Sequence, residues 1–429
     1  MVREMKHTEI GEIPAHWELQ TFEETFRVLS NNTLPRADLN DRGGTVRNVH
    51  YGDILTRFGE VLDCEKDEIP YLNDVSLLTA SAQVLQDGDV VLADTAEDNT
   101  VGKATEVHGL GKGRMVAGLH TIPCRVKKGD FVPKWLGYYM NSHMFHDQVL
   151  PYITGIKVSS ISKTALLETL IAVPPLEEQK AIVSALSAVD QLMAELKKTV
   201  SKLRDFKRGC LYLIFPQKGS DIPQMREPGY VEPWRQHKLS ELSDSFEYGL
   251  NAAAKEFDGE NKYIRITDID DASHGFNVED VTSPDTDIAN AENYKLTEGD
   301  ILFARTGASV GKTYIYKETD GLVYYAGFLI RAKIKKEYNP EFVFQNTLTA
   351  DYEKYIAVTS QRSGQPGVNA QEYSEYKIMV PDKAEQDKIS AYLGNLDHLI
   401  TLHQQKIYKY AQIKNAMMSE LITGKMKLV

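Results

Sequence analysis

Residues 174–215 read PPLEEQKAIVSALSAVDQLMAELKKTVSKLRDFKRGCLYLIF, a segment that opens with two prolines and continues as one long helical pattern. Pro174 and Pro175 fix the approach to a helix, and acidic Glu177 and Glu178 suit the positive end of its dipole. Apolar side chains then recur at alternating steps of four and three, at Ile182, Leu186, Val189, Met193, Leu196, Val200 and Leu203. This a/d spacing is typical of a coiled-coil seam and predicts a long helix that packs against another helix.

A copy of this segment lies 207 positions later and begins PDKAEQDKISAYLGNLDHLI. Glu178-Gln179 matches Glu385-Gln386, and Asp190 matches Asp397, at this single offset. The same apolar rhythm continues at Ile389, Leu393, Leu396, Ile400, His403, Ile407 and Tyr410. The chain is therefore an internal repeat. A tandem duplication that folds with pseudo-twofold symmetry places its two long helices antiparallel, as in an isologous dimer.

The sequence ahead of each long helix repeats as well. GDVVLA at 88–93 parallels GDILFA at 299–304, and VGK at 101–103 parallels VGK at 310–312. Runs such as 89–93 and 121–126 indicate short strands, and 136–140 fits a short helix. We expect an α+β domain at 1–173, a long helix at 174–215, a linker at 216–231, a second α+β domain at 232–380, and a second long helix with a C-terminal tail at 381–429.

Composition narrows the class of protein. No apolar run approaches the roughly 18 residues of a membrane span, and the start lacks a signal peptide, so we expect a cytoplasmic protein without a membrane partner. The net charge is −12, which opposes nucleic-acid binding. The segments 176–215 and 381–429 are each +2 and the remainder is −16, so DNA would have to be bound by local basic patches. Three scattered cysteines suggest neither disulfides nor a zinc site.

The chain resembles the specificity subunit of type I restriction-modification systems over essentially its whole length. The resemblance rests on GEIPAHWEL at 11–19, on GDILFARTGASVGK at 299–312 with its first-half equivalent, and on the helix starts VPPLEEQKAI and VPDKAEQDKI. It implies that 1–173 and 232–380 are target-recognition domains, each reading one half of a split sequence in double-stranded DNA. It also implies that the helices act as a spacer and dock methyltransferase subunits, with restriction subunits joining through the complex.

The same resemblance implies that this chain holds no cofactor. S-adenosylmethionine would be bound by the methyltransferase subunits, and ATP with magnesium by the restriction subunits. Residues at the helix starts would be free to meet a partner, namely Glu178, Gln179, Lys180, Glu385 and Gln386. In the first half the glycine-rich loop reads ADTAEDNTVGK, and acidic Glu97 and Asp98 argue against phosphate contact there.

Polar residues in glycine-rich loops are the candidate DNA contacts, because arginine suits guanine and asparagine or glutamine suits adenine. The first-half candidates are Arg36, Arg42, Arg47, Asn48, Lys112, Arg114, Lys157, Ser159 and Ser160. The second-half candidates are Asn251, Lys255, Arg265, Thr267, Arg305, Thr306, Ser309, Lys312, Gln361, Arg362 and Gln365. For each of them, a solvated loop side chain is the competing interpretation. Residues 307–313 have three residues between the glycines where a phosphate loop needs four, so nucleotide binding is disfavoured.

The sequence shows no pattern that predicts catalysis. Asn339-Pro-Glu-Phe342 resembles the Asn-Pro-Pro-aromatic motif of adenine methyltransferases, but Glu341 replaces the second proline, and a helix start explains it better. No nuclease carboxylates or metal-ligand cluster stand out. We therefore expect a non-catalytic, DNA-reading subunit. Two alternatives stay open: a coiled-coil scaffold without DNA contact, which the acidic charge favours, and an enzyme with an unrecognised site.

Two lysines remain unexplained by the helical pattern. Lys207 and Lys414 match at the 207-residue offset and fall on the apolar seam. A lysine there must extend its ammonium to solvent, meet a carboxylate or be covered by a partner.

Overall fold

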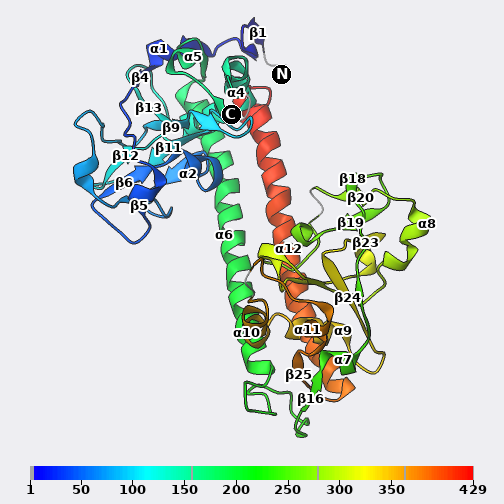
Figure 1. The fold of residues 1–429 in the computed structure, drawn as a ribbon. Coiled ribbons are helices and arrows are strands. Elements are labelled where there is room, and N and C mark those ends of the chain that lie inside the picture. Colours follow the sequence, from blue (N-terminus) through cyan, green and yellow to red (C-terminus); the bar gives the residue numbers. More distant parts are fainter. Residues whose placement is uncertain (1–3, 156–157, 278–279, 362–363, 429) are drawn as a thin grey trace. The chain divides into compact units, whose positions relative to one another are not determined.

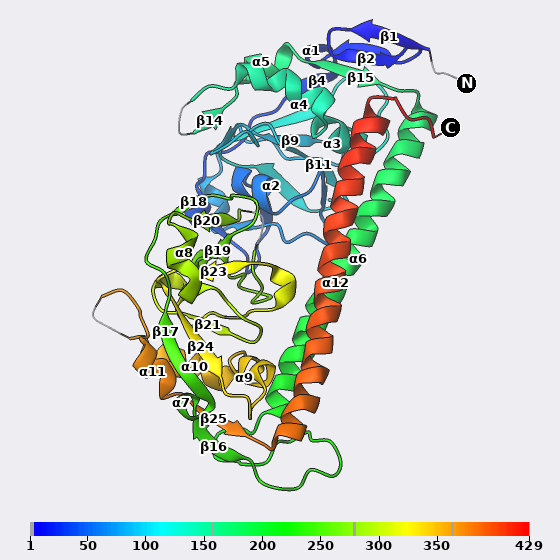
Figure 2. The same cartoon turned by 90° about the vertical axis from the view of Figure 1, so that its right-hand side faces the viewer.

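The computed structural model describes residues 4–155, 158–277, 280–361 and 364–428 (Figures 1 and 2). It divides into two compact units. Unit 1 comprises Met1–Ala194 and Tyr408–Val429, and unit 2 comprises Glu195–Ile407. Each unit therefore contains one α+β domain together with parts of both long helices.

The helices are short apart from two. Their bounds are α1 Phe22–Thr25, α2 Tyr51–Thr56, α3 Trp135–Met140, α4 His143–Val149, α5 Lys163–Leu167, α6 Leu176–Ile214, α7 Leu239–Leu242, α8 Ile288–Ala291, α9 Pro340–Asn346, α10 Ala350–Thr359, α11 Ala370–Ser374 and α12 Lys383–Ile422. The predicted short helix at 136–140 is α3, and Asn339 caps α9 by accepting from the Phe342 N–H. The Asn-Pro motif is thus a helix start, as expected.

Unit 1 is built on a five-stranded sheet of order β4-β13-β9-β11-β7 and a four-stranded sheet of order β12-β6-β8-β5. The remaining strands form the pairs β1-β2, β10-β14 and β15-β3. Their bounds are β1 Met5–Thr8, β2 Gly11–Pro14, β3 Glu18–Thr21, β4 Phe26–Val28, β5 Leu39–Asn40, β6 Val46–Val49, β7 Val61–Asp63, β8 Tyr71–Leu72, β9 Val90–Ala93, β10 Thr95–Ala96, β11 Ala104–His108, β12 Arg114–Ala117, β13 Thr121–Val126, β14 Ser159–Ser160 and β15 Leu170–Val173.

Unit 2 is built on two four-stranded sheets, of order β17-β24-β21-β22 and β18-β20-β19-β23, and the pair β16-β25. Their bounds are β16 Arg235–Lys238, β17 Ser243–Tyr248, β18 Ala254–Glu256, β19 Lys262–Ile264, β20 Thr282–Pro284, β21 Ile301–Ala304, β22 Thr313–Ile315, β23 Val323–Tyr325, β24 Leu329–Ile334 and β25 Lys377–Val380.

The repeated Gly-Asp sequence forms the same strand in both units. β9 and β21 are buried at every residue, as a continuous apolar run predicts. Each follows a glycine with positive φ, Gly88 at 85° and Gly299 at 84°, a conformation that glycine adopts without strain. The aspartates that follow these glycines are buried, and each pairs with an arginine: Asp89 with Arg125 and Asp300 with Arg331.

The starts of the long helices are anchored by two equivalent buried glutamines. Gln179 Oε1 accepts from the Val132 N–H at 2.9 Å, and its Nε2 donates to Pro174 O at 2.9 Å. Gln386 makes the same pair of bonds with Asn339 N–H and Pro381 O, each at 2.9 Å. Because a buried amide must be fully paired, these residues fix the docking of each helix on its own domain.

The unexplained lysines are paired inside the units. In unit 1, Lys414 Nζ of α12 lies 2.6 Å from Asp190 Oδ1 of α6 and 2.5 Å from Glu60 Oε2. In unit 2, Lys207 Nζ of α6 lies 2.6 Å from Asp397 Oδ1 of α12. The lysines match at the 207-residue offset, and so do the aspartates. Two equivalent ion pairs therefore join helix segments of both repeats, one within each unit.

Each unit has its own apolar core, to which both helices contribute. In unit 1, Leu186 of α6 and Leu421 of α12 pack with the strands and with Trp17 and Trp135. In unit 2, Leu211 of α6 and Leu393 of α12 pack with Trp234 and its neighbours. No helix in the described part of the chain is long and apolar enough to cross a membrane.

Candidate nucleic-acid interface

Arg305 lies where the buried strand β21 of unit 2 ends. Its backbone is held on both sides: the N–H donates to Phe328 O at 3.1 Å, and the carbonyl accepts from the Val368 N–H at 2.9 Å. The next residue, Thr306, forms an isolated β-bridge with Gly367. The loop around 365–368 is thus attached to the end of β21, which brings two stretches of sequence predicted to contact DNA into one place.

The side chain of Arg305 rests on an aromatic ring. Its guanidinium carbon lies 5.0 Å from the centroid of Tyr248, whose hydroxyl accepts from the Ala370 N–H at 3.2 Å. Tyr248 is 45% exposed and Phe328 is 59% exposed. Gln365 is exposed beside Gly307, with its Nε2 3.1 Å from where a Cβ would stand. An arginine resting on a part-exposed aromatic ring is an arrangement suited to nucleic acid.

Unit 1 has an acidic residue at the matching position. Asp94 follows β9 as Arg305 follows β21; its N–H donates to His120 O at 3.1 Å, and its carbonyl accepts from the Ile161 N–H at 2.9 Å. Its Oδ1 lies 3.3 Å from His120 Nδ1 and accepts from the Thr95 hydroxyl at 2.8 Å. The His120 ring meets Tyr51 edge-on at 5.2 Å between centroids. The backbone frame is therefore shared, while the charge is reversed.

Several second-half candidates are engaged within unit 2. Arg265 pairs with Asp268 at 2.9 Å, which raises the pKa of the guanidinium, and Thr267 donates to the same carboxylate at 3.0 Å. Lys312 pairs with Asp271 at 2.5 Å. Ser309 is buried, contrary to the expectation of an accessible loop serine. The loop at 307–309 forms one turn of 3₁₀ helix before β22 rather than a phosphate cradle.

The other second-half candidates lie on the surface. Asn251, Lys255 and Gln361 are exposed, Lys255 on β18. Arg362 lies outside the described residues.

The first-half candidates divide into a cluster and a set of internally bonded side chains. Arg114 stands opposite Val46 in the parallel pair β12-β6, and Lys112 and Arg114 are exposed. Arg47 Nη2 lies close to Gly113 and Nη1 donates to Cys64 O at 2.7 Å. This end of the four-stranded sheet therefore gathers three cations.

Arg36 and Asn48 make interactions within the domain. Arg36 pairs with Asp53 at 2.7 Å and with Asp41 at 3.5 Å. Asn48 is fully buried, accepting from Asn32 Nδ2 at 2.7 Å. The expectation that Asn48 is available to DNA is wrong, because an asparagine inside a polar network is shielded from a base.

Arg42 is exposed, and Ser159 and Ser160 are half-buried in β14, which pairs with β10. Lys157 lies outside the described residues.

The helix-start residues expected to meet a partner are mostly internal. Gln179 and Gln386 are buried as described, and Glu385 is buried against Arg226, with bonds of 2.8 and 2.7 Å. The expectation that these three face outward is wrong. Glu178 accepts from Trp17 Nε1 at 3.0 Å, whereas Lys180 is exposed beside Glu177.

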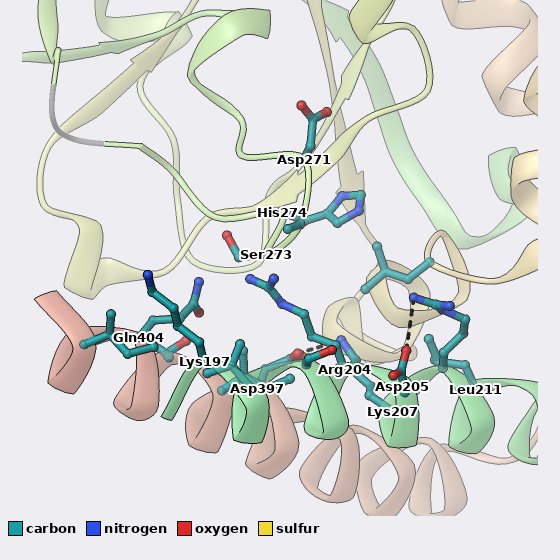
Figure 3. A pocket seen from close by; sticks show the side chains of 18 residues that line it. Lys197, Arg204, Asp205, Lys207, Leu211, Asp271, Ser273, His274, Asp397 and Gln404 are labelled. Carbon is teal, nitrogen blue, oxygen red and sulfur yellow. Dashed lines mark hydrogen bonds and ion pairs between the residues drawn. The ribbon is translucent and has the colours of Figure 1, made fainter. Parts of the chain in front are cut away.

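A cavity of about 720 Å³ lies within unit 2 between the helices and the loop 271–274 (Figure 3). Lys207, Arg208 and three aspartates line it, and these charges are paired locally or with Lys312. Lys197 and Arg204 have no ion pair among the described residues, and Arg204 Nε is buried without a hydrogen-bond partner there. Burial lowers the pKa of His274 on the opposite wall. The cavity is polar but close to neutral overall. Elsewhere, no three metal-ligating side chains cluster within the described ranges.

Comparison with known proteins identifies a matching family model and several relatives. The sequence model of the type I restriction modification DNA specificity domain matches residues 52–202 and 232–412. The MjaX protein of Methanocaldococcus jannaschii, named as a type I restriction enzyme specificity subunit, is 24% identical over 99% of this chain and 96% of its own length. The EcoKI specificity subunit of Escherichia coli K12 is 22% identical over 67% of this chain and 63% of its own length.

Two solved structures share the fold. The S subunit of a type I restriction-modification system from M. genitalium covers 98% of this chain and 99% of that chain, with 14% identity and a TM-score of 0.53. A chain from a study of assembly and conformational transition of a type I R-M system covers 96% and 99%, with 17% identity and a TM-score of 0.52. Since the two matched segments span well over half of the residues, the chain belongs to the family of type I restriction-modification DNA specificity proteins.

Proposed function

We propose that this chain is the DNA-specificity subunit of a type I restriction-modification complex, with the domain of each unit reading one half of a split DNA target. The recurrence of one loop frame in both units carries the proposal, because it presents a charged side chain at the end of β9, next to His120, and again at the end of β21, over Tyr248. Local exposed cations at Lys112, Arg114 and Lys255 support it against the overall acidic charge.

We further propose that the two domains are related by a pseudo-twofold axis and held apart by an antiparallel helix pair. The equivalent ion pairs Lys414–Asp190 and Lys207–Asp397 support this arrangement. α6 has 39 residues, which extend about 58 Å at about 1.5 Å per residue. That length exceeds one and a half turns of duplex at about 34 Å per turn, so the helices would set the spacer between half-sites.

Methyltransferase subunits would dock on the outer faces of these helices. Leu192 and Leu399 are both exposed, and so are Phe206 and Ile413; each pair matches at the 207-residue offset. Large apolar side chains that are exposed at repeated positions are typical of an interface, here one with two equivalent partners. Catalysis would belong to those partners: S-adenosylmethionine on the methyltransferase subunits, and ATP with magnesium on restriction subunits.

The test of the proposed function is co-expression with the methyltransferase partner, followed by sequencing of methylated bases in the host and a gel-shift assay of the complex. A split adenine motif with a fixed spacer, and retardation of DNA that carries it, is the expected result. Failure of the assembled complex to methylate or retard any DNA would favour the scaffold alternative instead. Lone-chain assays for methylation and cleavage address the enzymatic alternative.

Docking is tested by Leu192→Glu combined with Leu399→Glu. Loss of co-purification with the methyltransferase subunit is expected, because a carboxylate cannot be buried unpaired in an apolar interface. Lys202→Glu, on an exposed face of α6, is the control and should retain the partner. Equal co-purification of both variants would remove these leucines from the interface.

A further inference from the structure

The two units present opposite hydrogen-bonding chemistry at one structural position. Arg305 and Asp94 each follow the central buried strand, and each has its N–H bonded to a loop carbonyl and its own carbonyl bonded to a distant N–H. Because the backbone is held in the same way in both units, the side chain leaves it in the same direction in each. Only the side chain differs, a donor in unit 2 and an acceptor in unit 1.

The surroundings of Arg305 suit a contact with the edge of a base better than an ion pair. Its guanidinium lies over the Tyr248 ring, and the described residues offer it no carboxylate partner. Stacking on a ring that is itself hydrogen-bonded to Ala370 restricts the planar donor fork to few orientations. Such a fork matches the O6 and N7 acceptors of guanine in the major groove.

Asp94 fits a base and not the phosphate backbone. Its side chain is 25% exposed, and a carboxylate repels phosphates at short range. Oδ1 is occupied by Thr95 and lies near His120, while Oδ2 accepts no hydrogen bond from the described residues. An acceptor aimed at the major groove can bond the exocyclic N4 amine of cytosine. The acidic Glu97 and Asp98 that follow also disfavour a phosphate contact here.

We propose that Arg305 reads a guanine in one half-site and that Asp94 reads a cytosine at the corresponding place in the other. The proposal rests on the proposed DNA-recognition function and adds base identity to it. The duplicated loop frame holds the two residues at equivalent backbone positions. The difference between arginine and aspartate there replaces a hydrogen-bond donor to the base with an acceptor. Tyr248 is the positioning residue for Arg305, acting through ring stacking.

The test uses the complete complex with its methyltransferase subunits and a duplex library randomised in both half-sites. Arg305→Gln should change the preference at one position from guanine to adenine, because glutamine pairs with adenine N6 and N7, and the wild-type discrimination of about 10- to 100-fold there should be lost. Asp94→Asn should alter one position of the other half-site. Arg235→Gln and Asp147→Asn, both exposed, are the matched controls and should leave both motifs unchanged.

Three results would overturn the inference. Uniform weakening across all sequences, with a shallower salt dependence, would make Arg305 a phosphate contact. Unchanged selection by both variants would take the position out of the interface, and changes in the same half-site would break the assignment of one residue to each half. A wild-type complex that selects no sequence refutes the proposed function itself, which separates the two failures. Tyr248→Phe should preserve the guanine preference and Tyr248→Ala should reduce it; equal loss in both would exclude ring stacking.

Discussion

Lys207→Met is expected to loosen the C-terminal part of α6 within unit 2, because it leaves the carboxylate of Asp397 without its cation. The Lys207 side chain is 11% exposed and that of Asp397 is 32% exposed, with 2.6 Å between Nζ and Oδ1. Breaking a fully buried pair costs about 3–5 kcal/mol, and an exposed pair contributes under about 1 kcal/mol. The intermediate exposure places the expected loss at about 2 kcal/mol.

Lys414→Met should cost more, about 3 kcal/mol, because two carboxylates then lose the cation that bridges them. Lys414 Nζ bridges Glu60 and Asp190, and it also lies 5.4 Å from the centroid of the Tyr138 ring. The effect should be confined to unit 1, since the described partners of this lysine all belong there.

Peptide-resolved hydrogen exchange is the suitable assay, because it assigns a local opening free energy to each helix segment. The double variant Lys207→Met with Asp397→Leu should recover most of the lost protection, as removal of a whole buried pair is often nearly neutral. Gln345 then keeps its bond to Glu341 at 2.9 Å. Lys202→Met, on the exposed face of the same helix, is the control.

Two outcomes would contradict this coupling: amide exchange in Lys207→Met at the same rate as in Lys202→Met, or a double variant no better protected than Lys207→Met. Either outcome would mean that Lys207 and Asp397 are not coupled in solution.

Three further predictions concern recognition, packing and pH. Exchange of residues 232–380 for those of another family member should change one half-site in the methylated motif and leave the other; a change in both would contradict modular reading. Gly137→Ala should destabilise unit 1 by about 3 kcal/mol, since its Cβ would lie 2.1 Å from Glu60 O. Gly394→Ala, whose Cβ would meet none of the described residues within 4 Å, should raise the free energy of unfolding by about 1 kcal/mol, and urea titrations measure both changes. Burial raises the pKa of Glu106 to about 7 from 4.5. The stability that its protonated carboxyl contributes is therefore complete below pH 4.5 and lost as pH rises through 7. Glu106→Gln should abolish this decrease in the free energy of unfolding between pH 4.5 and 7, and an unchanged decrease would show that Glu106 is not its source.

Sequence periodicity was sufficient for the elements that depend on local pattern. Val90–Ala93 and Ile301–Ala304 form strands because continuous apolar runs of that length bury both faces. The long helix at Leu176–Ile214 follows from its seam residues and proline start. The buried glutamines were misread because a polar residue at a helix start is usually solvated. Their exact recurrence in two repeats was the available signal for an internal role.

The candidate interface was harder to predict, because it is assembled from distant segments. Arg305 was expected from its glycine-rich loop, but Tyr248 and Phe328 reach it only through sheet pairing and backbone contacts. Asp94 was missed because an acidic residue argues against DNA when charge alone is considered. Its position at the end of β9, matched with Arg305 at the end of β21, is the feature that identifies it.

The composition of the compact units has a genetic consequence. Unit 1 includes Tyr408–Val429 from the second repeat, and unit 2 includes the part of α6 that follows Ala194 in the first. A gene interrupted within the codons for residues 216–231 would yield two polypeptides, neither of which contains all the residues of a unit. Each product would need to exchange a helix segment with the other, so its stability would depend on expression level. The 16-residue linker at 216–231 replaces that dependence with a fixed effective concentration, so the single chain assembles both units at any level of expression.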